Sequence, residues 1–93
     1  MSTFQLQGAL DLSNVAEILA QPRLALQHEQ NLALDLSQIT WIDSAGLAGL
    51  VRLLADARKL GGELQVIDAS AVVHRALLFA RLDRLFPIQR KAA

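Results

Sequence analysis

The chain has 93 residues, of which 53% are hydrophobic and 19% charged, which is enough apolar material for a single folded domain spanning residues 1–93. Nine basic and nine acidic residues give a formal net charge of zero, which disfavours a nucleic acid or an anionic membrane as the partner. There is no cysteine, long apolar run or signal-peptide pattern, so we expect a soluble, cytoplasmic protein without a disulfide, a thiolate metal site or direct membrane insertion.

The first third of the chain predicts a strand followed by a broken helix. Phe4 and Leu6 alternate with glutamines, which is typical of a half-buried strand, and Gly8 is expected to end it. The segment 14–30 then has apolar residues at helical spacing. Pro22 interrupts this spacing, so the segment is either one kinked helix or two short ones.

The middle of the chain predicts a strand, a connector and the clearest helix. Leucines alternate with other residues over 32–37, which indicates a strand near the centre of a sheet, and "QIT" connects this strand to the helix. The helix is predicted from Ser44 to Leu60, where Gly61–Gly62 ends it. Its apolar face is expected to consist of Leu47, Leu50, Val51, Leu54 and Ala57.

The last third predicts a strand at "ELQVIDAS", a helix at "AVVHRALLFARL" and a short edge strand at "RLFPI" that Pro87 limits. Strands that alternate with helices in this way indicate an α/β fold. We expect a small, mostly parallel β-sheet of about four strands with about three helices packed against it.

Asp43 and Ser44, in the stretch "TWIDSAGLAGLV", mark the predicted switch from strand to helix. Either residue can cap the helix, which leaves the other side chain for another task, and Ala45 and Gly46 are small enough to leave the first turn open. Free amides at a helix start also tolerate an anion, so a phosphoryl group on Ser44 would change the surface without unfolding the domain. Trp41, next to this pair, is either a partner contact or a half-buried aromatic beneath the loop, and we favour the second interpretation.

Other kinds of site have little support in the sequence. His28 and His74 are not at metal-ligand spacing, and no Gly-x-Ser-x-Gly pattern surrounds Ser44 to make it a nucleophile. Gly46 and Gly49 do not belong to a phosphate-binding loop. We therefore expect a protein that is not an enzyme and that has no cofactor, no metal and no catalytic residues.

The sequence resembles the STAS domains (sulfate transporter and anti-sigma factor antagonist). The resemblance lies in "GALDLSN", "LALDLSQITWIDSAGLAGLV", "GGELQVI" and "LDRLFPI", and so covers nearly the whole chain. Two features depart from the usual pattern: Ala45 stands where many antagonists have a second hydroxyl residue, and the segment before Gly8 is shorter than their initial hairpin.

The resemblance implies a regulatory binding module similar to a bacterial anti-sigma factor antagonist. Its partner would be an anti-sigma factor serine kinase that contacts the helix Ser44–Leu60 and phosphorylates Ser44. Phosphorylation would then dissociate the complex. The implied partner-contact residues are Asp11, Asp43, Ser44, Ala45, Gly46 and Leu47. The alternative is a STAS accessory subunit that docks on the ATPase of a phospholipid-transporting ABC system through the same helix.

Overall fold

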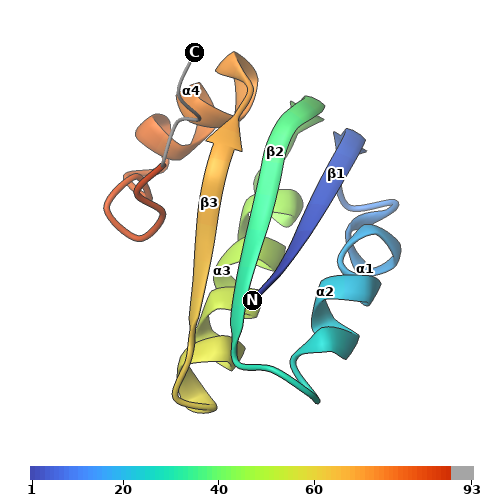
Figure 1. The fold of residues 1–93 in the computed structure, drawn as a ribbon. Coiled ribbons are helices and arrows are strands. Elements are labelled where there is room, and N and C mark those ends of the chain that lie inside the picture. Colours follow the sequence, from blue (N-terminus) through green and yellow to red (C-terminus); the bar gives the residue numbers. More distant parts are fainter. Residues whose placement is uncertain (89–93) are drawn as a thin grey trace.

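A computed structural model describes residues 1–88 as an α/β fold whose three strands form one parallel sheet in the order β1-β2-β3 (Figure 1). The strands are β1 (Ser2–Leu10), β2 (Asn31–Ile42) and β3 (Glu63–Ala69). The helices are α1 (Val15–Ile18), α2 (Ala20–Ala25), α3 (Ser44–Lys59) and α4 (Ala71–Phe79). The predicted α/β class with a small parallel sheet is confirmed.

The segment around Pro22 forms two short helices, which was one of the two predicted possibilities. Pro22 is the third residue of α2, where its missing N–H has no carbonyl acceptor within the helix to lose. β1 extends beyond its predicted end at Gly8, which adopts a φ of 85° and lets the strand continue to Leu10. β1 pairs in parallel with β2, so it forms one edge of the sheet.

β2 is the central strand and is longer than predicted, because the "QIT" segment belongs to the strand and is not a connector. Its pairing with β1 shifts register twice, between Gln5 and Gln7 and between Gly8 and Ala9, and each time β2 contributes one extra residue. These two bulges keep the buried side chains on one face although their spacing changes from two to three. The buried residues concerned are Leu32, Leu34, Leu36, Ile39 and Ile42.

The helices α1 and α3 lie together against the sheet, and Figure 1 shows α3 behind β2 and β3. Leu50, Leu54 and Ala57 of α3 are buried, as predicted. The buried face is rotated relative to the prediction, because Leu53 is fully buried while Leu47 and Val51 are only half-buried. Part of the predicted core face of α3 is therefore accessible at the surface.

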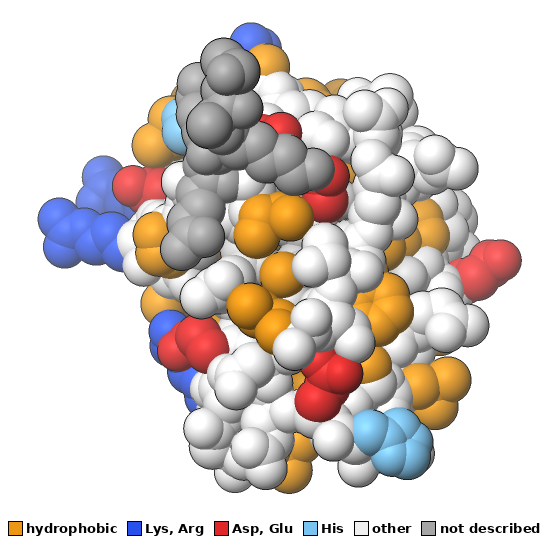
Figure 2. Space-filling model, viewed as in Figure 1, with side chains coloured by type: hydrophobic (Ala, Val, Ile, Leu, Met, Phe, Trp, Pro, Cys, Tyr) orange, Lys and Arg blue, Asp and Glu red, His pale blue; other side chains and the backbone are white. Residues whose placement is uncertain are grey.

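Exposed glutamines of β1 and β2 lie on the side of the sheet away from α3. Gln5, Gln7 and Gln38 are exposed; Gln7 pairs with Gln38, whereas Gln5 pairs with the buried Asp35. Figure 2, viewed from this side, shows scattered apolar and acidic side chains among backbone and other side chains. None of the helices within residues 1–88 has the length and apolar character needed to cross a membrane.

The end of the described chain differs from the prediction. α4 stops at Phe79, before the predicted end of the helix, because Arg81 adopts a left-handed φ of 58°. The segment "RLFPI" forms no strand within residues 1–88: Ile88 makes a single parallel bridge to Val66, and Phe86 is buried in the core. The sheet therefore has three strands in the described part, where about four were predicted.

Candidate functional site

Asp43 joins β2 to α3 and caps the helix. Its Oδ1 accepts a hydrogen bond from the backbone N–H of Gly46 at 2.9 Å, and its Oδ2 accepts one from the N–H of Leu12 at 3.2 Å. These bonds lower the pKa of the Asp43 carboxyl below its ordinary value, and the bond from Gly46 has the largest effect. Both oxygens of Asp43 are thus engaged within the domain, and the predicted capping role falls to this residue.

Ser44 is the first residue of α3 and is exposed. Its hydroxyl makes no hydrogen bond to any residue in the range 1–88. By contrast, the Ser70 hydroxyl accepts a hydrogen bond from the N–H of Val73 and caps α4. Two serines at helix starts therefore differ in their tasks, and only the Ser44 hydroxyl is available to another molecule.

The loop after β1 lies beside this helix start. Asp11 is half-buried, and its Oδ1 accepts hydrogen bonds from the N–H of Ser13 at 3.0 Å and from the Ser13 hydroxyl at 2.6 Å. The bond from Leu12 to Asp43 links the loop to the start of α3. The structure therefore brings together Asp11 and Asp43, which are far apart in the sequence, at the carboxyl ends of β1 and β2.

Leu12 is a surface feature that the sequence did not single out. Its side chain is 78% exposed, although its backbone is fixed to Asp43. Together with Trp41, which is 56% exposed at the same end of the sheet, it forms an apolar surface suited to contact a protein partner. The only available sequence signal was an apolar residue between two polar ones in a turn, which alone does not distinguish exposure from burial.

Packing within the domain leaves no room for a side chain at position 46, where the chain has a glycine. A Cβ added to it would lie 2.3 Å from the carbonyl oxygen of Leu10 and 2.9 Å from Cγ1 of Ile42. The space that the sequence suggested was open to a partner is therefore occupied by the end of β1. Ala45 and Leu47, on either side, are half-buried and remain partly accessible.

Two adjoining shallow, mostly apolar hollows that share Val51 and Ala55, here together called the α3 groove, follow the outer side of α3 from Ser44 to Lys59. The segment after α4 forms its other wall. The lining residues are Ser44, Leu47, Ala48, Val51, Arg52, Leu54, Ala55, Arg58, Lys59, Ala80, Leu82 and Leu85. The half-buried Leu47 and Val51 contribute to this surface, which begins at the free hydroxyl of Ser44.

Trp41 does not lie beneath the loop as interpreted from the sequence. It pairs with Ala9 on β1 and is 56% exposed. The bulge in β2 between Ile39 and Trp41 explains the difference, because it changes which residues of the strand point into the core. The ring is therefore available at the same end of the sheet as Leu12.

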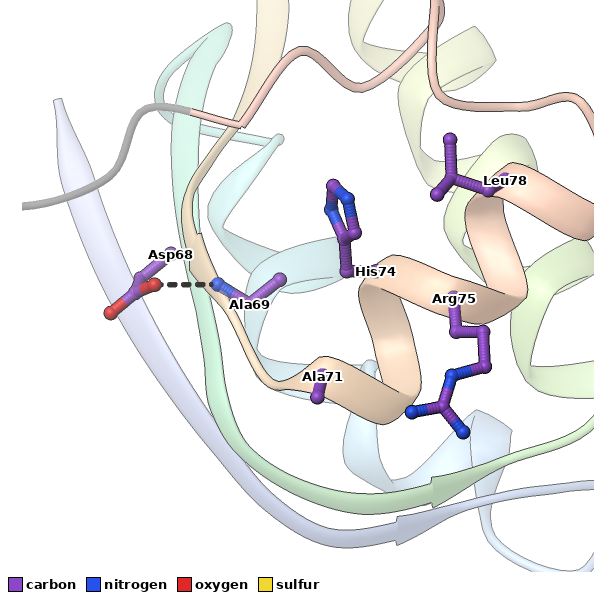
Figure 3. Close-up of a pocket in the computed structure, with 6 residues that line it drawn as sticks. All are labelled: Asp68, Ala69, Ala71, His74, Arg75 and Leu78. Carbon is purple, nitrogen blue, oxygen red and sulfur yellow. Dashed lines mark hydrogen bonds between the residues drawn. The ribbon is translucent and has the colours of Figure 1, made fainter.

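A second hollow lies between the end of β3 and α4 (Figure 3). His74 and Arg75 point in different directions from α4, and Asp68 points away from both and accepts a hydrogen bond from the N–H of Ala69 at 2.9 Å. These side chains do not converge on one point. Within residues 1–88, no three His, Cys, Asp or Glu side chains lie together as a metal site would require.

Comparison with known proteins identifies the family. The sequence model described as "Mlab, STAS domain" matches residues 2–88. The chain belongs to the STAS domain family. One relative of this STAS domain, an anti-sigma F factor antagonist from Paenibacillus polymyxa, is 30% identical over 86 residues, which are 90% of this chain and 74% of the relative.

Two solved structures share the fold of this STAS domain. The anti-sigma factor antagonist SpoIIAA in its unphosphorylated form has a TM-score of 0.79 and 17% identity, with 98% of this chain and 80% of that chain covered. A Thermotoga maritima protein described as an anti-sigma factor antagonist has a TM-score of 0.76 and 23% identity, with 97% and 80% covered. At these identities the structural likeness supports the fold and not a shared partner.

Proposed function

We propose that this STAS domain is a regulatory binding module that acts as an anti-sigma factor antagonist: it binds a serine kinase partner and is released when Ser44 is phosphorylated. One observation carries the proposal. The neighbouring side chains Asp43 and Ser44 divide two tasks, because Asp43 uses both carboxylate oxygens to hold the fold while Ser44 is exposed with an unbonded hydroxyl.

Phosphorylation of Ser44 would act through charge. A phosphoryl group adds about −1.5 to −2 charge near neutral pH, at a helix start whose amides tolerate an anion. The new charge would lie beside the Asp43 carboxylate, whose lowered pKa keeps it ionised. A partner that fits this surface in its unmodified state would then meet repulsion and lose contact, while the domain itself stays folded.

The contact surface in this proposal has three parts. The loop with Asp11 and the exposed Leu12 lies on one side of Ser44, and the α3 groove extends from Ser44 on the other. Ala45 and Leu47 are accessible in part and belong to the contact. Gly46 would contribute indirectly, by allowing the end of β1 to approach the helix start.

The alternative proposal, docking on the ATPase of a phospholipid-transporting ABC system, would use the same helix without any modification of Ser44. The Paenibacillus polymyxa relative carries the name of an anti-sigma F factor antagonist, which favours the switched module. The two proposals differ in a measurable way, since only the first needs a kinase that modifies Ser44.

The test is phosphorylation of the full chain by candidate anti-sigma kinases with ATP, followed by intact-mass measurement and peptide mapping. We expect one phosphate, located on Ser44, and loss of kinase binding after its addition. The matched control is Ser13→Ala, which removes another exposed serine in the adjacent loop, whose hydroxyl is already bonded to Asp11. If Ser44→Ala still gains the phosphate, or no co-encoded kinase modifies the chain, the switch is wrong.

A further inference from the structure

The length and the apolar lining of the α3 groove indicate what kind of partner would fit it, whether or not Ser44 is modified. α3 has 16 residues, so a groove along its outer side is about 24 Å long at 1.5 Å per residue. Its floor and walls are mainly Ala, Val and Leu side chains. These dimensions suit a partner helix of about four turns that lays an apolar stripe into the groove.

The charged residues that line the α3 groove all have the same sign. They are Arg52, Arg58 and Lys59, and no carboxylate is among the lining residues. Arg58 is paired with Glu63 at 3.0 Å, on the exposed surface. Arg52 and Lys59 form no ion pair with any residue in the range 1–88. In a chain whose net charge is zero, this surface is therefore locally basic.

Helix electrostatics explain only part of this arrangement. Arg58 and Lys59 are in the last turn of α3, where cations are favoured by the helix dipole. Arg52 lies in the middle of the helix, where the dipole gives it no such advantage. Asp56, the acidic residue of α3, pairs instead with Arg23 of α2, away from the groove. The positive charge of the groove therefore depends in part on Arg52, whose position the helix dipole does not explain.

We propose that the α3 groove binds an amphipathic helix of the protein partner whose apolar stripe is flanked by acidic side chains. The inference rests on the proposed function, because it specifies the partner of the same surface. The apolar floor favours a protein helix over a nucleic acid or a lipid headgroup, which would leave Leu47, Val51 and Leu82 uncovered.

The two ends of the α3 groove would have different tasks in regulation. Ser44 and Arg52 are eight positions apart, which is about 12 Å along a helix and exceeds the screening length of about 8 Å at physiological salt. A phosphate on Ser44 therefore would not neutralise Arg52 or Lys59. It would instead repel the acidic flank of the partner helix at one end of the groove.

The test measures binding of fluorescent, helix-stapled peptides of about four turns to the full chain by anisotropy. The peptides share one Leu/Ala stripe and carry Glu, Gln or Lys on both flanks. We expect the Glu peptide to bind on the order of tenfold more tightly than the Lys peptide, with a preference that shrinks as salt is raised. The double variant R52E/K59E should reverse the preference, and R52Q/K59Q should remove it.

Arg75→Glu is the matched control, because it reverses an exposed arginine on α4 outside the groove and should leave the preference unchanged. Circular dichroism confirms that each variant is folded. Equal binding of the three peptides, no binding of the Glu peptide, or binding to phosphatidylglycerol vesicles that R52E/K59E abolishes would each overturn the inference. Phosphorylation of Ser44, measured by mass, tests the proposed function separately.

Discussion

Replacing Gly46 by Ala tests whether the start of α3 is held by the close approach of β1. The new Cβ would lie 2.3 Å from the Leu10 carbonyl oxygen, which also accepts a hydrogen bond from the N–H of Asp43 at 3.3 Å. Backbone must therefore move, and overpacking of this kind costs about 1–3 kcal/mol. The better helix propensity of Ala offsets about 1 kcal/mol of that cost. Because the atom met at 2.3 Å is a backbone oxygen, the cost lies in the upper part of that range, about 2–3 kcal/mol, and we expect a net loss of about 1–2 kcal/mol in the free energy of unfolding.

Urea unfolding followed by far-UV circular dichroism measures this difference. The control is Ala48→Gly, an exposed position of the same helix where only propensity changes, and which should lose about 1 kcal/mol. Ala48→Gly lowers helix propensity, whereas Gly46→Ala raises it. If helix propensity alone decided stability, Gly46→Ala would therefore stabilise the domain. A Gly46→Ala protein as stable as the wild type, or more stable, would refute the contact with Leu10 as the reason for this glycine.

Four further outcomes are expected. Leu50→Ala removes a core side chain that is 1% exposed and should cost about 2–5 kcal/mol in urea unfolding, and an unchanged midpoint would mean that the buried face of α3 is misassigned. Ser44→Asp should leave the thermal midpoint nearly unchanged and weaken kinase binding in a titration, and a collapsed midpoint would make Ser44 structural. Leu12→Lys should likewise spare stability and weaken binding, whereas unaltered affinity would remove Leu12 from the contact surface. Because the pKa of Asp43 is lowered by folding, its charge stabilises the domain above the pH range where an unfolded aspartate titrates, and this stabilisation is lost as the pH falls through the folded pKa. Asp43→Asn should therefore flatten the acid side of the midpoint-against-pH curve, and parallel curves for the two proteins would contradict that role.

The sequence allowed the fold class and the place of the Asp43–Ser44 pair in the fold to be predicted, because local patterns agree with the tertiary structure there. The apolar spacing and Gly61 predict the ends of α3 nearly as observed. Gly61 adopts a left-handed φ of 85°, which such a helix end requires. The Asp43–Ser44 pair lies at the strand-to-helix switch, as predicted, because a capping residue directly precedes a strong helical pattern.

The remaining features depend on contacts that local patterns do not encode. The bulges in β2 give Leu36, Ile39 and Ile42 a spacing of three, which does not match the period of two by which strands are recognised. The reason for Gly46 lies in Leu10, at the end of another strand. The rotation of the buried face of α3 likewise depends on which neighbours cover it. For this reason the apolar spacing places Leu47 and Val51 in the core, although they line the α3 groove.

Asp43 helps to hold the fold and the Ser44 hydroxyl does not, and this division of tasks affects how such domains can diverge. Since no residue of the range 1–88 relies on the Ser44 hydroxyl, this position can change without any compensating change in the core. A regulated domain and a constitutive docking subunit can then differ by one oxygen atom on the same scaffold. Under the proposed function, control of the complex would be gained or lost in a single substitution, while the proposed contact surface would be inherited intact.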